Sequence, residues 1–131
     1  DWNTYSSLQR SFMKANVIDI ELLMDNAMQE LLYQKCIEFG VNKIYSGNNV
    51  VGEGMRMPIG WAHTKYDGGN IKRINRLYEQ ADLSTMPVLT KAKKAIYQKI
   101  FRIKWFRPLD FINYEKNSVL ELLKREIGYE R

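Results

Sequence analysis

The sequence predicts a single α/β domain over residues 1–131, rich in helix and with one or more short parallel strands. Three observations support this: apolar residues recur at helical spacing in several segments, one segment has the order helix–glycine–strand, and the composition supplies a core. With 131 residues, of which 45% are hydrophobic, the chain can bury such a core. The single cysteine excludes an internal disulfide. No apolar run reaches the length of a membrane span, and no secretory leader is visible, so we expect a cytoplasmic protein.

The helix–glycine–strand order lies in the first third of the chain. Residues 2–15 have the apolar spacing of a helix, and Asp25 is expected to cap a second helix that ends near Phe39. Gly40 suits the position that follows a helix, and Val41–Tyr45 is expected to form a strand. The apolar spacing predicts that the buried face of the second helix consists of Met28, Leu31, Leu32, Cys36 and Phe39.

The second half of the chain is predicted to be helical, with breaks at glycine and proline. A helix is expected from Asn70 to about Glu79, a longer one over Lys91–Ile103, and a last one over Tyr114–Ile127 that ends at Gly128. Pro108 interrupts the chain between the last two. The predicted buried stripe of the long helix consists of Ala92, Ala95, Ile96, Ile100 and Ile103.

A polar loop follows the predicted strand, in the stretch KIYSGNNVVGEG. In parallel sheets, ligands bind outside the carboxyl ends of the strands, which is where this loop begins. Glycine allows close approach of a ligand, the polar side chains exchange hydrogen bonds, and a nearby carboxylate suits a metal ion or a sugar hydroxyl. The alternative is that asparagine and glycine only supply turn geometry. The candidate residues are Ser46, Gly47, Asn48, Asn49 and Glu53.

Two further groups of side chains are candidates for chemistry. Asp19, Glu21 and Asp25 suit Mg²⁺ or the orientation of a nucleophile, although the simpler explanation is that Asp25 caps the helix and the other two are solvated. The only histidine, His63, has no second histidine for a metal site, and it is expected on the surface. Its neighbours could line a sugar pocket: Trp61, Lys65, Tyr66 and Asp67.

Positive charge is concentrated in one segment. Seven basic residues and no acidic ones occur between Leu83 and Leu109, interleaved with aromatic side chains, although a solvated helix face is the ordinary explanation. An alternative function is therefore a non-catalytic binding module that uses residues 91–107 for a membrane surface, a protein partner or, least expected, nucleic acid. Arg107, just before Pro108, could meet a phosphate or simply pack. The basic residues are Lys91, Lys93, Lys94, Lys99, Arg102, Lys104 and Arg107.

Four segments together resemble a known family. They are LQRSFMKANVIDIELLMDNAM, GVNKIYSGNNVVGEGMRMPIGWAHTKYD, NIKRINRLY and IKWFRPLDFINYEKNSVLELLKREIGY. In this order they resemble the N-acetyl sugar amidotransferases of lipopolysaccharide and surface-polysaccharide biosynthesis. That family is similar to the PP-loop ATP pyrophosphatases, which have a Rossmann-like fold of the adenine nucleotide alpha hydrolase type. The resemblance covers nearly the whole chain.

The resemblance implies an activity that uses ATP and Mg²⁺. The acetamido group of a nucleotide-linked sugar is adenylated, and ammonia from a partner glutaminase displaces AMP to leave an acetamidino group. Adenylation is sensible because an amide oxygen is a poor leaving group, while cations and backbone donors hold the developing charge. A PP-loop relative that acts on another substrate, such as a tRNA base or a carboxylate, stays open because the adenylation step is shared.

The resemblance also implies roles for residues. Ser46-Gly47-Asn48-Asn49 matches a nucleotide-facing loop, Glu53 matches an acidic position after it, and Asp25 belongs to the family's D-I-E…D stretch. Asn26 occupies a position where relatives often have histidine, which weakens any proton-transfer role there. The family's Ser-Gly-Gly-x-Asp-Ser pyrophosphate loop does not occur in these residues. We therefore expect the later portion of a longer enzyme, inactive in ATP hydrolysis by itself.

Overall fold

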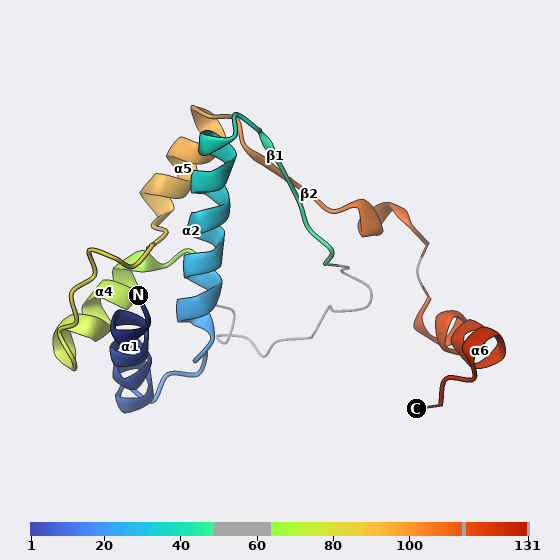
Figure 1. The fold of residues 1–131 in the computed structure, drawn as a ribbon, viewed down its shortest axis with the longest axis horizontal. Helices are drawn as coiled ribbons and strands as arrows, with labels where there is room; N and C mark the ends of the chain where they lie inside the picture. The colour runs from blue at the N-terminus through green and yellow to red at the C-terminus, as the bar shows by residue number, and fades with distance from the viewer. Residues whose placement is uncertain (49–63, 114, 131) are drawn as a thin grey trace.

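The computed structural model describes residues 1–48, 64–113 and 115–130. Helices α1, α2, α4 and α5 gather into one body, β1 and β2 run side by side away from it, and α6 lies apart beyond them (Figure 1). The elements in chain order are α1 (Trp2–Lys14), α2 (Leu22–Glu38), β1 (Lys43–Tyr45), α4 (Gly68–Leu77), α5 (Lys91–Lys99), β2 (Lys104–Phe106), the 3-10 helix η1 (Pro108–Phe111) and α6 (Lys116–Ile127).

The described residues form a helix-rich α/β fold with a parallel sheet of two short strands. β1 pairs with β2, and Lys43, Ile44 and Tyr45 lie opposite Lys104, Trp105 and Phe106. This confirms the predicted fold class at the coarse level. None of the described helices is both long and apolar enough to cross a membrane.

Local chemistry explains several helix ends. Asp1 caps α1 by accepting hydrogen bonds from the backbone N–H groups of Asn3 and Thr4. Gly40 and Gly128 follow α2 and α6 with φ angles of +64° and +68°, a left-handed conformation that favours glycine. The prediction for α4, from Asn70 to about Glu79, was displaced by two residues: Asp67 accepts a hydrogen bond from Asn70 N, so the helix begins at Gly68, and it ends at Leu77.

The body has an apolar core between α1, the start of α2 and α4. Leu8, Phe12, Leu23 and Ile71 are completely buried there, and Val88 closes one side. Gly68 permits this closure: a Cβ atom at that position would lie 2.6 Å from Val88 Cγ1 and 2.7 Å from the Leu89 carbonyl oxygen. A second core lies between the later part of α2, β1 and the segment that enters β2, and consists of Tyr33, Cys36, Ile44, Leu89 and Ile103.

The predicted buried face of α2 was wrong except at Cys36. The side of the helix that faces the body carries two polar residues, Asn26 and Glu30, and an aromatic one, Tyr33, all completely buried. These residues are spaced four and three apart and therefore share one helix face. The apolar residues on the opposite side are between 42% and 70% exposed, namely Met28, Leu31, Leu32 and Phe39.

The predicted helix over 91–103 was too long, and its predicted buried stripe was wrong except at Ile103. α5 ends at Lys99, and Arg102 then adopts a φ angle of +54°, which redirects the chain into β2. Ile96 and Ile100 are 45% and 70% exposed, whereas Ile103 is buried in the second core. Strand β2 itself was not predicted, because the residues between Ile103 and Pro108 were interpreted only as the break after a helix.

Candidate functional site

The carboxyl ends of β1 and β2 bring two separate parts of the chain together. The backbone N–H of Ser46 donates to the carbonyl oxygen of Phe106 at 2.9 Å. Ser46 therefore lies directly beyond both strands, with Gly47 and Asn48 continuing from β1 and Arg107 continuing from β2. The predicted loop and Arg107, for which either a phosphate contact or simple packing was expected, thus share the edge of a parallel sheet where ligands ordinarily bind.

The loop after β1 is a compact polar turn. Ser46 Oγ donates to Asn48 Oδ1 at 2.9 Å and accepts from Asn48 N at 3.3 Å. These bonds are the turn geometry that the simpler interpretation of the loop requires. A Cβ atom at Gly47 would meet no atom of residues 1–48, 64–113 and 115–130 within 4 Å, so crowding by these described residues does not require glycine there. With respect to the described part of the chain, the backbone at Gly47 is open to approach. Asn49 and Glu53 lie outside the described residues.

Arg107 is held at this edge by its neighbours. Its Nε lies 2.7 Å from Asp110 Oδ2 in η1, and the arginine side chain is 51% exposed. Phe106 packs edge-on against Tyr45, with ring centroids 5.5 Å apart, and stacks on Phe111 at 5.4 Å. Because guanidinium has five N–H donors in a fixed plane, the pair with Asp110 leaves donors that can meet an anion.

A second group of predicted residues meets at the start of α2. Lys65 Nζ lies 2.6 Å from Asp19 Oδ2 and 2.8 Å from Asp25 Oδ2. Burial of Lys65 opposes its charge, but the hydrogen bonds to the two aspartates outweigh this effect and raise its pKa. The prediction that Asp25 caps α2 was wrong: the helix begins at Leu22 after Glu21, and Asp25 lies in its first turn, where its carboxylate pairs with Lys65.

The backbone around this second group is fixed by Asn26. Its Nδ2 donates to the carbonyl oxygens of Lys65 at 2.8 Å and Leu89 at 2.9 Å, and its Oδ1 accepts from Leu89 N at 2.8 Å. Asp67 caps α4, so it has a structural role whatever else it binds. Trp61 and His63 lie outside the described residues.

A small pocket of about 280 Å³ adjoins Asp19. Asn16, Asp19 and Asn70 give it a polar rim, and Phe12 and Leu22 contribute to its apolar wall. Its volume lies just below the range of roughly 300–1,000 Å³ typical of ligand pockets, so it suits one small group rather than a whole nucleotide sugar. No described contact joins this region to the Ser46 loop.

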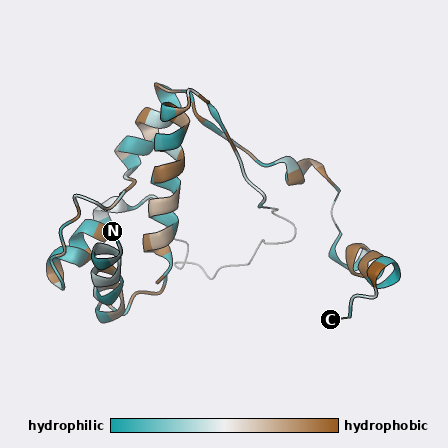
Figure 2. Ribbon diagram, in the orientation of Figure 1, coloured by the Kyte–Doolittle hydropathy of each residue, from teal (hydrophilic) through white to brown (hydrophobic). Residues whose placement is uncertain are grey.

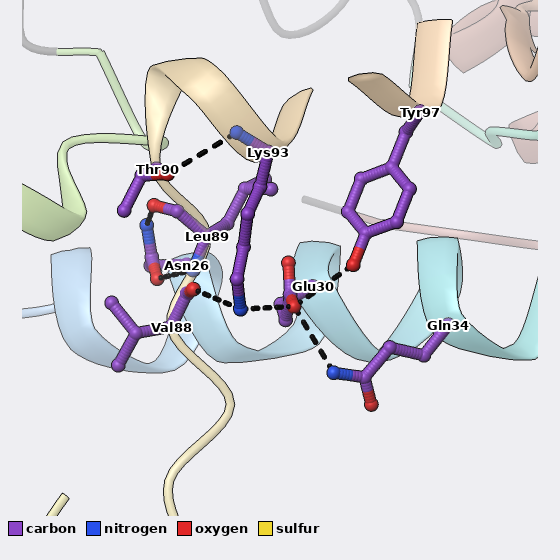
Figure 3. A network of polar contacts seen from close by, with 8 residues as sticks. All are labelled: Asn26, Glu30, Gln34, Val88, Leu89, Thr90, Lys93 and Tyr97. Carbon is purple, nitrogen blue, oxygen red and sulfur yellow. Dashed lines mark hydrogen bonds and ion pairs between the residues drawn. The ribbon is translucent and has the colours of Figure 1, made fainter. Parts of the chain in front are cut away.

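A third polar group, centred on Glu30, was not predicted at all (Figure 3). Glu30 Oε1 accepts hydrogen bonds from Lys93 Nζ at 2.7 Å, Tyr97 OH at 3.0 Å and Gln34 Nε2 at 3.0 Å. Burial, together with the bond to Glu30, raises the pKa of Tyr97 to about 12. The sequence did contain a signal for this group, because Asn26, Glu30 and Tyr33 are spaced to share one helix face. Three side chains with polar groups on one face, however, ordinarily indicate a face exposed to solvent.

The basic segment is partly neutralised within the chain. Lys93 pairs with the buried Glu30, Lys94 Nζ lies 3.3 Å from the ring centroid of Tyr66, and Arg107 pairs with Asp110. Three of the seven basic side chains therefore have internal partners, which leaves less free charge for an extended anionic surface than the sequence indicated. The described residues favour the sheet edge over the basic helix as the candidate site.

Comparisons with known proteins found no matching family model, no matching curated protein and no matching solved structure. The resemblance described above therefore stays a prediction. Within residues 1–48, 64–113 and 115–130, no group of three or more histidine, cysteine, aspartate or glutamate side chains could hold a metal ion. The described side chains at the sheet edge suit an anion better than a cation.

Proposed function

We propose that this chain forms part of an ATP-dependent N-acetyl sugar amidotransferase with a PP-loop fold. The observation that supports the proposal is the meeting of the Ser46–Asn48 loop with Arg107 at the carboxyl ends of two parallel strands, joined by the Ser46–Phe106 hydrogen bond of 2.9 Å. Anionic nucleotides bind at this kind of edge because backbone N–H groups and cations are directed toward the space beyond the strands.

In this proposal the loop after β1 and Arg107 after β2 have different roles. The open backbone at Gly47 and the amide of Asn48 would contact the nucleotide, and the guanidinium of Arg107 would stabilise phosphate charge. When the acetamido oxygen of the sugar attacks the α-phosphorus of ATP, negative charge builds up on the leaving pyrophosphate, and fixed donors lower the barrier by holding it. Ammonia then adds to the adenylated carbon, and AMP leaves with the former amide oxygen.

The remaining participants follow from the same proposal. Mg²⁺ would arrive with ATP and would need carboxylates beyond the described ones at this edge, for which Glu53 is the sequence candidate. Asp25 is proposed to act through its pair with Lys65, which together with Trp61 and Asp67 would face the nucleotide-linked sugar. A glutaminase subunit would supply ammonia in the cytoplasm.

The test is nucleotide binding by the chain itself, measured by titration calorimetry with a non-hydrolysable ATP analogue and Mg²⁺. We expect weak binding that falls at least about tenfold in both Asn48→Ala and Arg107→Gln, because each removes one contact that is worth about 1.5–3 kcal/mol to a charged ligand.

The matched control is Lys99→Gln, which removes the same charge as Arg107→Gln from the last turn of α5. Equal losses in Lys99→Gln and Arg107→Gln would indicate non-specific attraction by net charge. Charge reversal at Lys91 and Lys99 that abolishes binding of anionic vesicles or RNA, with no nucleotide binding in any variant, would instead establish the binding-module alternative.

A further inference from the structure

Tyr33 in α2 joins the helical body to strand β2. Its ring is completely buried, and its hydroxyl accepts a hydrogen bond from Trp105 Nε1 at 2.9 Å. Gln98 Nε2, at 3.5 Å, is a second and longer donor to the same hydroxyl. The rings of Tyr33 and Trp105 meet edge to face, with centroids 6.3 Å apart. Trp105 is the middle residue of β2, so the body holds this strand at its centre.

The position of Tyr33 is itself fixed by two helices of the body. Its ring stacks on that of Tyr97 in α5, with centroids 4.8 Å apart and planes that differ by 10°. The Tyr97 hydroxyl in turn donates to the buried carboxylate of Glu30 at 3.0 Å. α2 and α5 therefore both hold the tyrosine whose hydroxyl meets Trp105.

The side chains of β2 are exposed, in contrast to the centre of β1, where Ile44 is buried. Polar and apolar residues both occur along β2 and η1 (Figure 2). Phe106 packs against Tyr45 and Phe111, but these two rings are themselves 67% and 77% exposed. Of the contacts that side chains of β2 make within the described part of the chain, those of Trp105 with Tyr33 reach the helical body.

Trp105 lies two residues before Arg107, the basic residue of the sheet edge. Arg107 keeps extended dihedral angles, with φ −114° and ψ 92°, so strand geometry continues to it. The two residues are therefore about 7 Å apart along the chain and share one face of the strand. Between them lies the carbonyl group of Phe106, which accepts the hydrogen bond from Ser46 N. A displacement of Trp105 would thus move both Arg107 and the partner of Ser46.

We propose that Tyr33 is a positioning residue for the sheet edge, which through Trp105 fixes how far Arg107 lies from the Ser46–Asn48 loop. This inference rests on the proposed function, because it assigns the loop and Arg107 to one ligand, the polyphosphate of a nucleotide. Groups that bind one ligand together must be held within about 0.5 Å of the productive geometry. An exposed strand needs a fixed point in the body to meet this requirement.

Tyr33→Phe tests this role, because it removes the hydroxyl and keeps the ring that stacks on Tyr97. Burial raises the pKa of Tyr33, although the hydrogen bond from Trp105 lowers it, so the substitution removes a neutral group and no charge. We expect the affinity for a non-hydrolysable ATP analogue with Mg²⁺, measured by titration calorimetry, to fall about three- to tenfold. Hydrogen exchange of the Ser46 amide, measured by NMR, should become at least about threefold faster.

Two variants control for the removal of a hydroxyl and for a loss of stability. Tyr5→Phe removes the same group from a partly buried ring that stacks on Trp2 in α1, and it should change neither measurement. Ile74→Val lowers stability by removing a methylene group from the first core, and it should leave the affinity unchanged. Circular dichroism verifies that every variant is folded.

The route through Trp105 is tested in a Trp105→Phe background, which lacks the indole N–H. Trp105→Phe by itself should lower the affinity at least as much as Tyr33→Phe does. Adding Tyr33→Phe to it should then cause no further loss of affinity and no faster exchange of the Ser46 amide. A further loss as large as in the unmodified chain overturns the proposal, as does an equal loss of affinity in Ile74→Val.

The two measurements distinguish failure of this inference from failure of the proposed function. If the analogue binds and Tyr33→Phe leaves its affinity unchanged, the positioning role alone is overturned. If the unmodified chain does not bind the analogue, the proposed function fails, and exchange of the Ser46 amide decides the positioning role. Equal exchange rates in Tyr33→Phe and the unmodified chain then overturn it.

Discussion

The helical body and the region beyond it differ in the solvent exposure of their apolar side chains. In the helical body, Leu8, Phe12 and Leu23 are completely buried between α1, α2 and α4. Beyond the body, Tyr45 at the end of β1 is 67% exposed and Phe111 in η1 is 77% exposed. Parallel strands are ordinarily covered on both faces. The body therefore has the packing of a stable unit, whereas the sheet and α6 present surfaces suited to contacts with ligands and partners.

A second contrast lies within α2 itself. Its inner side buries the polar groups of Asn26 and Glu30, while its outer side exposes methionine and leucine. Asn26 and Glu30 Oε1 form hydrogen bonds to segments that lie far away in sequence, such as Leu89 and Lys93. Glu30 Oε2 is buried without a hydrogen-bond partner in the described part of the chain. Polar contacts across the body thus replace part of the apolar packing that the sequence indicated.

The largest expected effect compares two phenylalanines, one at each end. Phe12→Ala should lower the free energy of unfolding by about 3–5 kcal/mol, because it leaves a cavity in a completely buried site. Phe111→Ala should lower it by no more than about 1 kcal/mol, since this ring loses only its stacking contact with Phe106. Urea unfolding measures both. Equal losses would contradict the distinction between the body and the sheet end.

The next effect concerns the hydrogen bonds of Asn26, which join α2 to the segment before α5. Asn26→Ala should lower the free energy of unfolding by about 2–3 kcal/mol, because the buried N–H of Leu89 loses its acceptor and two carbonyl groups lose a donor. Asn117→Ala in the exposed first turn of α6 is the control and should change it by about 0.5 kcal/mol or less. If both substitutions are equally mild, Asn26 does not hold the body together.

A smaller and asymmetric effect is expected at the Glu30–Lys93 pair. Lys93→Ala should lower the free energy of unfolding by about 1–3 kcal/mol, since it leaves a carboxylate in a site with no solvent exposure. Glu30→Gln should have an effect of about 1 kcal/mol or less, because glutamine keeps an acceptor and the half-exposed lysine can turn to water. Lys91→Ala, on the exposed start of α5, controls for helix propensity. A larger loss in Glu30→Gln would reverse the inferred asymmetry.

The smallest effect is a dependence on alkaline pH. The Tyr97 hydroxyl has a pKa of about 12 in the folded chain against 10.0 for the free side chain. The unfolded state therefore releases this proton first, so stability should be full below pH 10 and should fall as pH rises toward 12. Tyr97→Phe should flatten this decline in urea unfolding curves recorded from pH 9 to 12. An unchanged slope would show that Tyr97 does not carry the effect.

Local chemistry in the sequence determined that helices form, where some of them end, and the coarse α/β class. Gly40 and Gly128 end helices as predicted, because only glycine adopts the required left-handed conformation at little cost. The Ser46–Asn48 loop was placed correctly after its strand for a similar local reason. Its proposed role with nucleotide remains a prediction, as does the role of Glu53.

Only the tertiary structure decided what these elements face. Strand β2 depends on pairing with a partner about 60 residues earlier in the chain, a contact that no local pattern encodes. The same pairing places Arg107 beside Ser46. The buried side of α2 was likewise set by long-range partners: Leu89, Lys93 and Tyr97 donate hydrogen bonds to Asn26 and Glu30 there, so burial followed hydrogen bonding rather than hydropathy.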